Sequence, residues 1–268
     1  MSSCPLARRP LNREDSNMDT NYVIEERVIE RAMAKYPDIK ELVEFSTPVV
    51  SFGYPKKATV ATLGINPSSN EFQIGNGNKN PLISGEKRLV DTLDLGVVKP
   101  ESLSRDQAIK VINGCYDYFN VKPYEWFTKL EQIILAPSGY SYFDESACHL
   151  DLVQWATDPV WQSIKDKTIT KELLDADKEF LEFQLKEYDF DIIFLNGGTV
   201  VKTVKSLDLC EFKEAGSIEF NSKGTKSLIE VGEYRGKRLI GWGLNAGYDA
   251  TYKPGLNQLS SWLRDYLN

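Results

Sequence analysis

A short apolar run that ends at a polar turn constrains the fold of this chain more than any other segment. Residues 58–72 read ATVATLGINPSSNEF, and residues 59–65 present no polar face. Such a run predicts a strand covered on both sides, as in a parallel sheet. Pro67 lacks a backbone donor and favours an extended Asn66, so the Asn66 side chain is expected at the carboxyl end of the strand, where α/β sheets bind ligands. The alternative is an ordinary strand exit, in which Asn66 or Ser68 forms an Asx turn or caps the next helix.

The rest of the sequence alternates strand and helix patterns. Strands are predicted at 147–157, 192–198, 217–234 and 235–242. Helices are predicted at 21–36, 39–45, 85–92, 104–119, 124–135, 170–188 and 256–267. Residues 70–84 are rich in glycine and asparagine and are expected to form a long loop. This order predicts an α/β protein, a three-layer α/β/α sandwich with a mainly parallel sheet of about four to five strands.

The length allows one large α/β domain or two small ones, and no strong linker divides the sequence. The chain has 268 residues, 41% of them apolar, and we expect a single domain over residues 21–268 behind a disordered tail, residues 1–20. No apolar run approaches the roughly 20 residues of a membrane span, and no signal peptide opens the chain. We therefore expect a cytoplasmic monomer with no membrane partner.

Cysteine spacing and net charge limit the chemistry further. The cysteines form no CxxC pair and His149 is the only histidine, so we predict no metal and no organic cofactor. A net charge of -7 argues against a protein that coats nucleic acid by charge alone, but not against a local basic face. The candidates for such a face, each of which is equally compatible with a solvated surface position, are Lys79, Lys87, Arg88, Arg235, Lys237, Arg238 and Lys253.

Two polar side chains interrupt the strand predicted at 147–157. Alternation places His149 and Asp151 on the same face of this strand. Aspartate is disfavoured inside strands, which indicates a function for Asp151. The alternative is that both side chains lie on a solvated edge or bond one another.

The GINPS segment, residues 64–68, resembles the first active-site motif of the uracil-DNA glycosylase superfamily, in particular its mismatch-specific uracil and thymine branch. The resemblance implies that Asn66 places the water that attacks the sugar and that the backbone of Gly64, Ile65, Pro67 and Ser68 approaches a flipped base. Ser68 stands where that branch has glycine. Phe72 is expected to stack on the base, and the aromatics of 124–135 are expected in the core because they recur at helical spacing.

Two other matches to the superfamily are positional. Asp151 falls where a base-reading asparagine is expected, next to His149. Asn245 falls near the histidine of the last motif, and Tyr248, Tyr252 and Lys253 follow it as candidates for a wedge and a phosphate contact with DNA. The alternative for this last segment is a glycine-rich loop that enters the final helix.

An aspartate at position 151 affects which base the site would bind. An ionised carboxylate only accepts hydrogen bonds, and cytosine presents an amine where uracil presents a carbonyl. We therefore predict a DNA glycosylase that excises a modified cytosine, such as the glucosylated hydroxymethylcytosine of phage DNA, in antiviral defence. Alternatives are a uracil or mismatch repair glycosylase, a non-catalytic DNA-binding member of the fold, and, from a different class, a nucleotide-processing enzyme that holds phosphate at Gly197 and Gly198.

Overall fold

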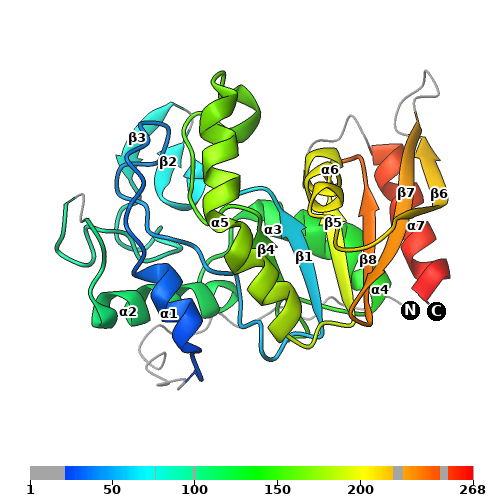
Figure 1. Ribbon diagram of the computed structural model, residues 1–268, viewed down its shortest axis with the longest axis horizontal. Coiled ribbons are helices and arrows are strands. Elements are labelled where there is room, and N and C mark those ends of the chain that lie inside the picture. The colour runs from blue at the N-terminus through cyan, green and yellow to red at the C-terminus, as the bar shows by residue number, and fades with distance from the viewer. Residues whose placement is uncertain (1–21, 76, 99–100, 220–225, 248–252, 268) are drawn as a thin grey trace, which may run out of the picture.

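A six-stranded sheet forms the centre of the protein (Figure 1), with the strand order β4-β1-β5-β8-β7-β6. The computed structural model describes residues 22–75, 77–98, 101–219, 226–247 and 253–267. The strands are β1 (Val60–Gly64), β4 (Ala147–Asp151), β5 (Ile192–Asn196), β6 (Lys213–Glu219), β7 (Lys226–Tyr234) and β8 (Lys237–Trp242). Strands β4, β1, β5 and β8 run parallel to one another. Strand β7 pairs with β8 in antiparallel fashion, and β6 pairs with β7 in antiparallel fashion.

The sheet confirms the α/β class and its mainly parallel character, but it has more strands than predicted. The difference lies at 217–234, where one predicted strand is in fact the pair β6 and β7. The sequence between them contains Asn221, Ser222 and Gly224, which are turn-forming residues that the strand prediction overlooked.

Most of the remaining regular secondary structure is helical. The helices are α1 (Glu26–Ala32), α2 (Arg105–Tyr116), α3 (Glu125–Leu130), α4 (Ala136–Ser138), α5 (Lys167–Glu187), α6 (Gly198–Ser206) and α7 (Lys253–Leu267), with 3-10 turns η2 (Ser69–Glu71), η3 (Tyr118–Asn120) and η5 (Trp161–Ser163). A π-helical turn, η4 (Glu131–Leu135), joins α3 to α4, so the helix predicted at 124–135 continues past Pro137 instead of ending there.

Two predicted helices are wrong. Residues 39–45 form turns, because Leu42 bridges to Thr157 and the Val43 N–H donates to the Ala156 carbonyl. These backbone groups are therefore not free for helical bonds. Residues 85–92 also form turns and bends. Lys87 there pairs with Asp91 and Asp94, and a sharp turn brings the backbone N–H of each aspartate to the carboxylate of the other.

The predicted loop at 70–84 is a small hairpin instead. Strands β2 (Gln73–Gly75) and β3 (Asn78–Pro81) pair in antiparallel fashion. Gly75 has φ +83° and Gly77 φ +81°, a left-handed conformation that glycine adopts without strain. The asparagines and glycines thus mark a tight turn between two short strands.

Helices cover both faces of the sheet. On one face, Ala61 and Leu63 of β1 pack with Leu181 of α5 and Val204 of α6. On the other face, Val60 belongs to a larger cluster that includes residues of α2, α3, η4 and α7. Figure 1 shows α5 and α6 on the near side of the sheet and α4 on the far side. This burial on both faces explains the apolar run at residues 59–65.

Candidate functional site

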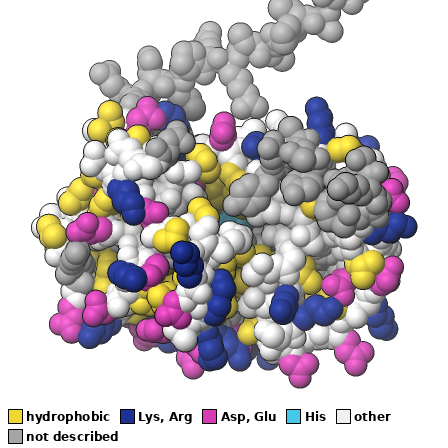
Figure 2. Space-filling model, turned by 90° about the horizontal axis from the view of Figure 1, so that it is seen from above, with side chains coloured by type: hydrophobic (Ala, Val, Ile, Leu, Met, Phe, Trp, Pro, Cys, Tyr) yellow, Lys and Arg dark blue, Asp and Glu magenta, His cyan; other side chains and the backbone are white. Residues whose placement is uncertain are grey.

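A cavity of about 320 Å³ lies where β1 and β4 end. Five segments line it, residues 64–71, His149 with Asp151, and parts of 124–129, 157–162 and 245–247, together with Phe52. Figure 2 shows the imidazole of the only histidine at the bottom of a hollow. In the parallel register Thr62 lies beside His149 and Gly64 beside Asp151, which brings two distant segments to one face.

The cavity brings together eight of the residues predicted from the sequence. They are Gly64, Ile65, Asn66, Pro67, Ser68, His149, Asp151 and Asn245. Phe72 is not among them, and its prediction as a base-stacking residue is wrong. It is 2% exposed and packs in the main hydrophobic core, and it does not line the cavity. Lys253 begins α7 as an exposed residue that does not line the cavity, and Tyr248 and Tyr252 lie outside the described residues.

The orientation of the Asn66 side chain is fixed by its neighbours. Its Nδ2 donates to the Trp155 carbonyl and to Thr157 Oγ1, both at 3.1 Å, and lies 3.1 Å from the Pro67 carbonyl. Three acceptors surround this end of the amide, so the nitrogen and not the oxygen lies there. Oδ1 is therefore the side-chain atom left to accept from a ligand or a water molecule. Ser68 supplies the cap predicted for this turn, since its Oγ accepts from the Asn70 N–H.

A buried chain of polar contacts ends at Asp151. Thr62 Oγ1 lies 2.5 Å from Tyr142 Oη and 2.7 Å from His149 Nδ1, and His149 Nε2 lies 3.3 Å from Asp151 Oδ1. Burial holds the pKa of Tyr142 well above its ordinary value, which keeps its proton in place. The two short hydrogen bonds hold Thr62, Tyr142 and the Nδ1 side of the imidazole together, and Nε2 faces the Asp151 carboxylate.

This arrangement rules out a solvated edge for the two residues. His149 is 2% exposed and Asp151 is 5% exposed. The backbone of Phe52 covers the outer side of β4, donating to the His149 carbonyl at 2.8 Å and accepting from its N–H at 2.9 Å. The contact between the two side chains, which the sequence left open, is present. Asp151 is thus held beside the His149 imidazole inside the cavity.

Gly64 leaves the space that the carboxylate occupies. A Cβ at this position would lie 2.5 Å from Asp151 Oδ1 and 2.8 Å from His149 Nε2. Gly64→Ala is therefore expected to lower the free energy of unfolding by about 1–3 kcal/mol, as for other overpacked cores. Urea denaturation measures this loss. The control is Gly198→Ala, whose Cβ would meet its nearest atom at 3.4 Å and which should cost less than about 0.5 kcal/mol. Equal costs for the two variants would contradict the packing at Gly64.

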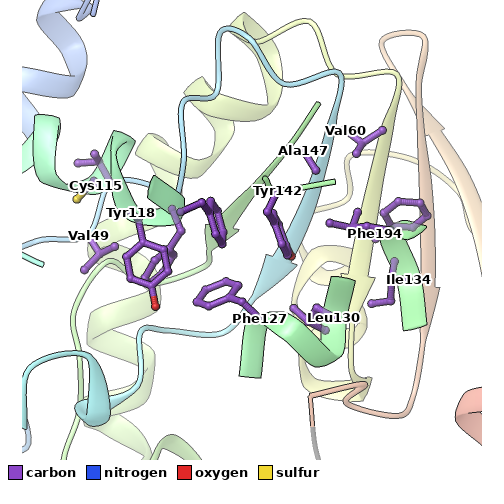
Figure 3. Close-up of a cluster of buried hydrophobic side chains, with 14 of the residues drawn as sticks. Val49, Val60, Cys115, Tyr118, Phe127, Leu130, Ile134, Tyr142, Ala147 and Phe194 are labelled. Carbon is purple, nitrogen blue, oxygen red and sulfur yellow. The ribbon is translucent and has the colours of Figure 1, made fainter. Parts of the chain in front are cut away.

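The cavity has one component that the sequence did not single out, Glu71, and one that was predicted to lie in the core, Trp126, which is only half-buried. Glu71 lines it as a buried carboxyl, although it reads as a polar loop residue in the sequence. Trp126 also lines it, with its ring 5.3 Å from that of His149 in an edge-on contact. Phe127 is a core residue, as predicted for the aromatics of its helix, yet it too reaches the cavity. Figure 3 shows Phe127 beside Tyr118 and Tyr142 in this aromatic cluster.

Asn245 belongs to a network at the far wall of the cavity. Its Oδ1 accepts from Asn196 Nδ2 at 3.2 Å and from the Gly247 N–H at 2.9 Å, so its Nδ2 remains as a donor. The Asn196 Oδ1 accepts from the Ala246 N–H. Nearby, the Gly198 N–H donates to the Gly243 carbonyl, which occupies one of the amides that a phosphate at Gly197 and Gly198 would need. The geometry therefore gives no support to a nucleotide site at that turn.

Several of the candidate basic residues are already paired. Lys79 binds Asp158 at 2.8 Å, Lys87 binds Asp91 and Asp94, and the Arg88 guanidinium lies over the Tyr124 ring. The face in Figure 2 carries Lys and Arg side chains interspersed with Asp and Glu. Lys129 is a further cation at the cavity that the sequence did not single out. Within the described part of the chain, no group of three His, Cys, Asp or Glu side chains could hold a metal ion.

Comparison with known proteins adds no family assignment. Neither the protein-family models nor the curated proteins that were searched include a match to this chain. No helix among the described residues is long and apolar enough to span a membrane.

Proposed function

We propose that the protein is a monofunctional DNA glycosylase, which flips a base out of the duplex into the cavity and hydrolyses its N-glycosidic bond. One observation carries the proposal. The acceptor oxygen of Asn66 and the acceptor carboxylate of Asp151 line the same cavity, from the ends of two neighbouring strands. A cavity of about 320 Å³ falls in the usual size range of small-molecule sites and suits one base.

In this proposal Asn66 holds the attacking water through Oδ1, and Asp151 reads the base. Asn245 Nδ2 and Lys129 face the sugar and phosphates of the flipped nucleotide, and Trp126 offers a ring for stacking. The parallel order β4-β1-β5-β8, with helices on both faces, supports the uracil-DNA glycosylase-like fold that the GINPS resemblance implies. The partner is DNA, the protein acts as a cytoplasmic monomer, and the reaction needs no organic cofactor.

The place of Asp151 in the cavity favours an amine-bearing base. A carboxylate accepts hydrogen bonds, and the amine of cytosine is the matching donor. Because removal of ordinary cytosine would damage the cell's own DNA, we propose a modified cytosine as the target. Glucosylated hydroxymethylcytosine in phage DNA is the specific candidate, which would make the enzyme an antiviral defence protein.

A base-release assay tests this proposal. Duplexes that contain uracil, cytosine or glucosylated hydroxymethylcytosine are incubated with the protein, and abasic sites are counted. Asp151→Asn should lower release of the cytosine-type base and raise release of uracil, changing their ratio by about 10–100-fold, because asparagine also donates. Release of uracil alone by the unaltered protein would contradict the role of Asp151. No release from any duplex would contradict the glycosylase proposal itself.

A further inference from the structure

Glu71 is a second buried carboxyl in the cavity, and the roles proposed so far do not use it. It is the last residue of η2 and is only 2% exposed, yet it lines the same space as Asn66 and Asp151. Tyr118 Oη donates to Glu71 Oε2 at 2.7 Å and itself accepts from the Tyr124 N–H at 2.9 Å. This contact fixes one carboxyl oxygen, so the other oxygen is the one available to the cavity.

The charges around Glu71 come from several elements. Burial raises the pKa of Glu71 to about 7, and the negative charge of Asp151 also raises it, while the Tyr118 hydrogen bond and the Arg88 charge lower it. His149, Glu125 and Lys129 line the same cavity. Near neutral pH a large fraction of Glu71 is therefore a neutral acid, which can donate. Asp151, whose Oδ1 lies 3.3 Å from His149 Nε2, offers carboxylate oxygens as acceptors.

We propose that Glu71 is a catalytic acid that donates a proton to the ring nitrogen of the flipped base while Asp151 accepts from the adjacent amine. The pair thereby selects a base with an amine next to an acceptor nitrogen, as in the cytosine class. This inference rests on the proposed glycosylase function and names its substrate class. Uracil carries N–H at that ring position and offers nothing for Glu71 to protonate.

The reaction balances through this acid. The bond between C1′ and N1 breaks, and its electron pair stays with the base. The Glu71 proton goes to N3, so the base leaves as a neutral molecule. Water held by Asn66 adds its oxygen to C1′ and releases a proton, which restores the Glu71 acid through solvent. An acid whose pKa lies near the working pH suits such a transfer, and general acid catalysis contributes about 10²–10⁴-fold.

The test is the pH dependence of single-turnover base release from the glucosylated hydroxymethylcytosine duplex. For the unaltered protein the rate should fall above about pH 7, because Glu71 loses its proton as the pH rises through its pKa. Glu71→Gln should be slower by about 10²–10⁴-fold at pH 6 and should lose the alkaline fall, with duplex affinity kept, since glutamine still donates a hydrogen bond. The control Glu125→Gln, an exposed carboxyl at the cavity, should keep the alkaline fall.

A second variant guards against a folding defect in Glu71→Gln. Tyr118→Phe removes the hydrogen bond that lowers the Glu71 pKa, so the alkaline fall should move to higher pH. If Glu71→Gln keeps both the rate and the pH profile, or if Tyr118→Phe does not move the fall, the acid role is overturned while the glycosylase proposal stands. Release of uracil rather than the cytosine-type base would overturn the substrate class. Absence of release from every duplex would overturn the proposed function, and this inference with it.

Discussion

Asn66→Ala is expected to slow base release by about 10²–10³-fold in single turnover, with duplex affinity changed only a few-fold. The reason is the fixed orientation of the side chain. Trp155 and Thr157 accept from Nδ2, which leaves Oδ1 for the water that we propose is held in line with C1′. Loss of one preorganised group of this kind typically costs about 10²–10³-fold in rate, because water is then no longer held in a reactive position.

A graded control strengthens the Asn66 experiment. Thr157→Val removes one acceptor of the amide but keeps the side chain of Asn66, so it should slow release by less than Asn66→Ala. Electrophoretic mobility shifts measure affinity for the same duplex in parallel. A protein that binds the duplex and never releases base, with or without Asn66, would be the non-catalytic binding alternative. Full activity of Asn66→Ala would show that the water is held by another residue.

Asp177→Ala is expected to lower the free energy of unfolding by about 3–5 kcal/mol, a large share of the stability of a typical domain. Asp177 of α5 binds Arg31 of α1 at 2.5 Å and accepts from the Gln154 N–H at 2.8 Å, and both charged side chains are almost fully buried. Removal of the carboxylate leaves the Arg31 charge buried beside an unpaired N–H. Urea denaturation at pH 7 measures the loss.

The matched control lies on the same helix. Asp175 pairs with Lys171 on the exposed side of α5, where Asp175→Ala should change the unfolding free energy by less than about 1 kcal/mol. Asp177→Asn should fall between the two, because it keeps an acceptor for the Gln154 N–H but loses the charge opposite Arg31. Similar losses for Asp175→Ala and Asp177→Ala would contradict a structural role for the buried pair. Asp177 also binds the backbone of Gln154, which directly precedes the two residues that accept from Asn66, namely Trp155 and Thr157.

The sequence by itself determined the features that depend on local pattern. The apolar run at 59–65 predicted β1, and Pro67 predicted the polar turn with Asn66 at the carboxyl end. The alternation around His149 and Asp151 placed both on one face of β4, because side chains along a strand repeat every two residues. These inferences needed only the geometry of a few consecutive residues.

Only the tertiary structure decided which side chains surround the cavity at the carboxyl ends of β1 and β4, and how the pKa of a carboxyl there is shifted. Glu71 and Phe72 are neighbours in the sequence, yet Glu71 lines the cavity and Phe72 packs in the core cluster that also contains Tyr118. The shifted pKa of Glu71 arises from burial and from Tyr118, Arg88 and Asp151, which no local pattern places beside it. Burial and charge depend on residues that are distant along the chain, so the chemistry of this site follows from packing rather than from any segment read alone.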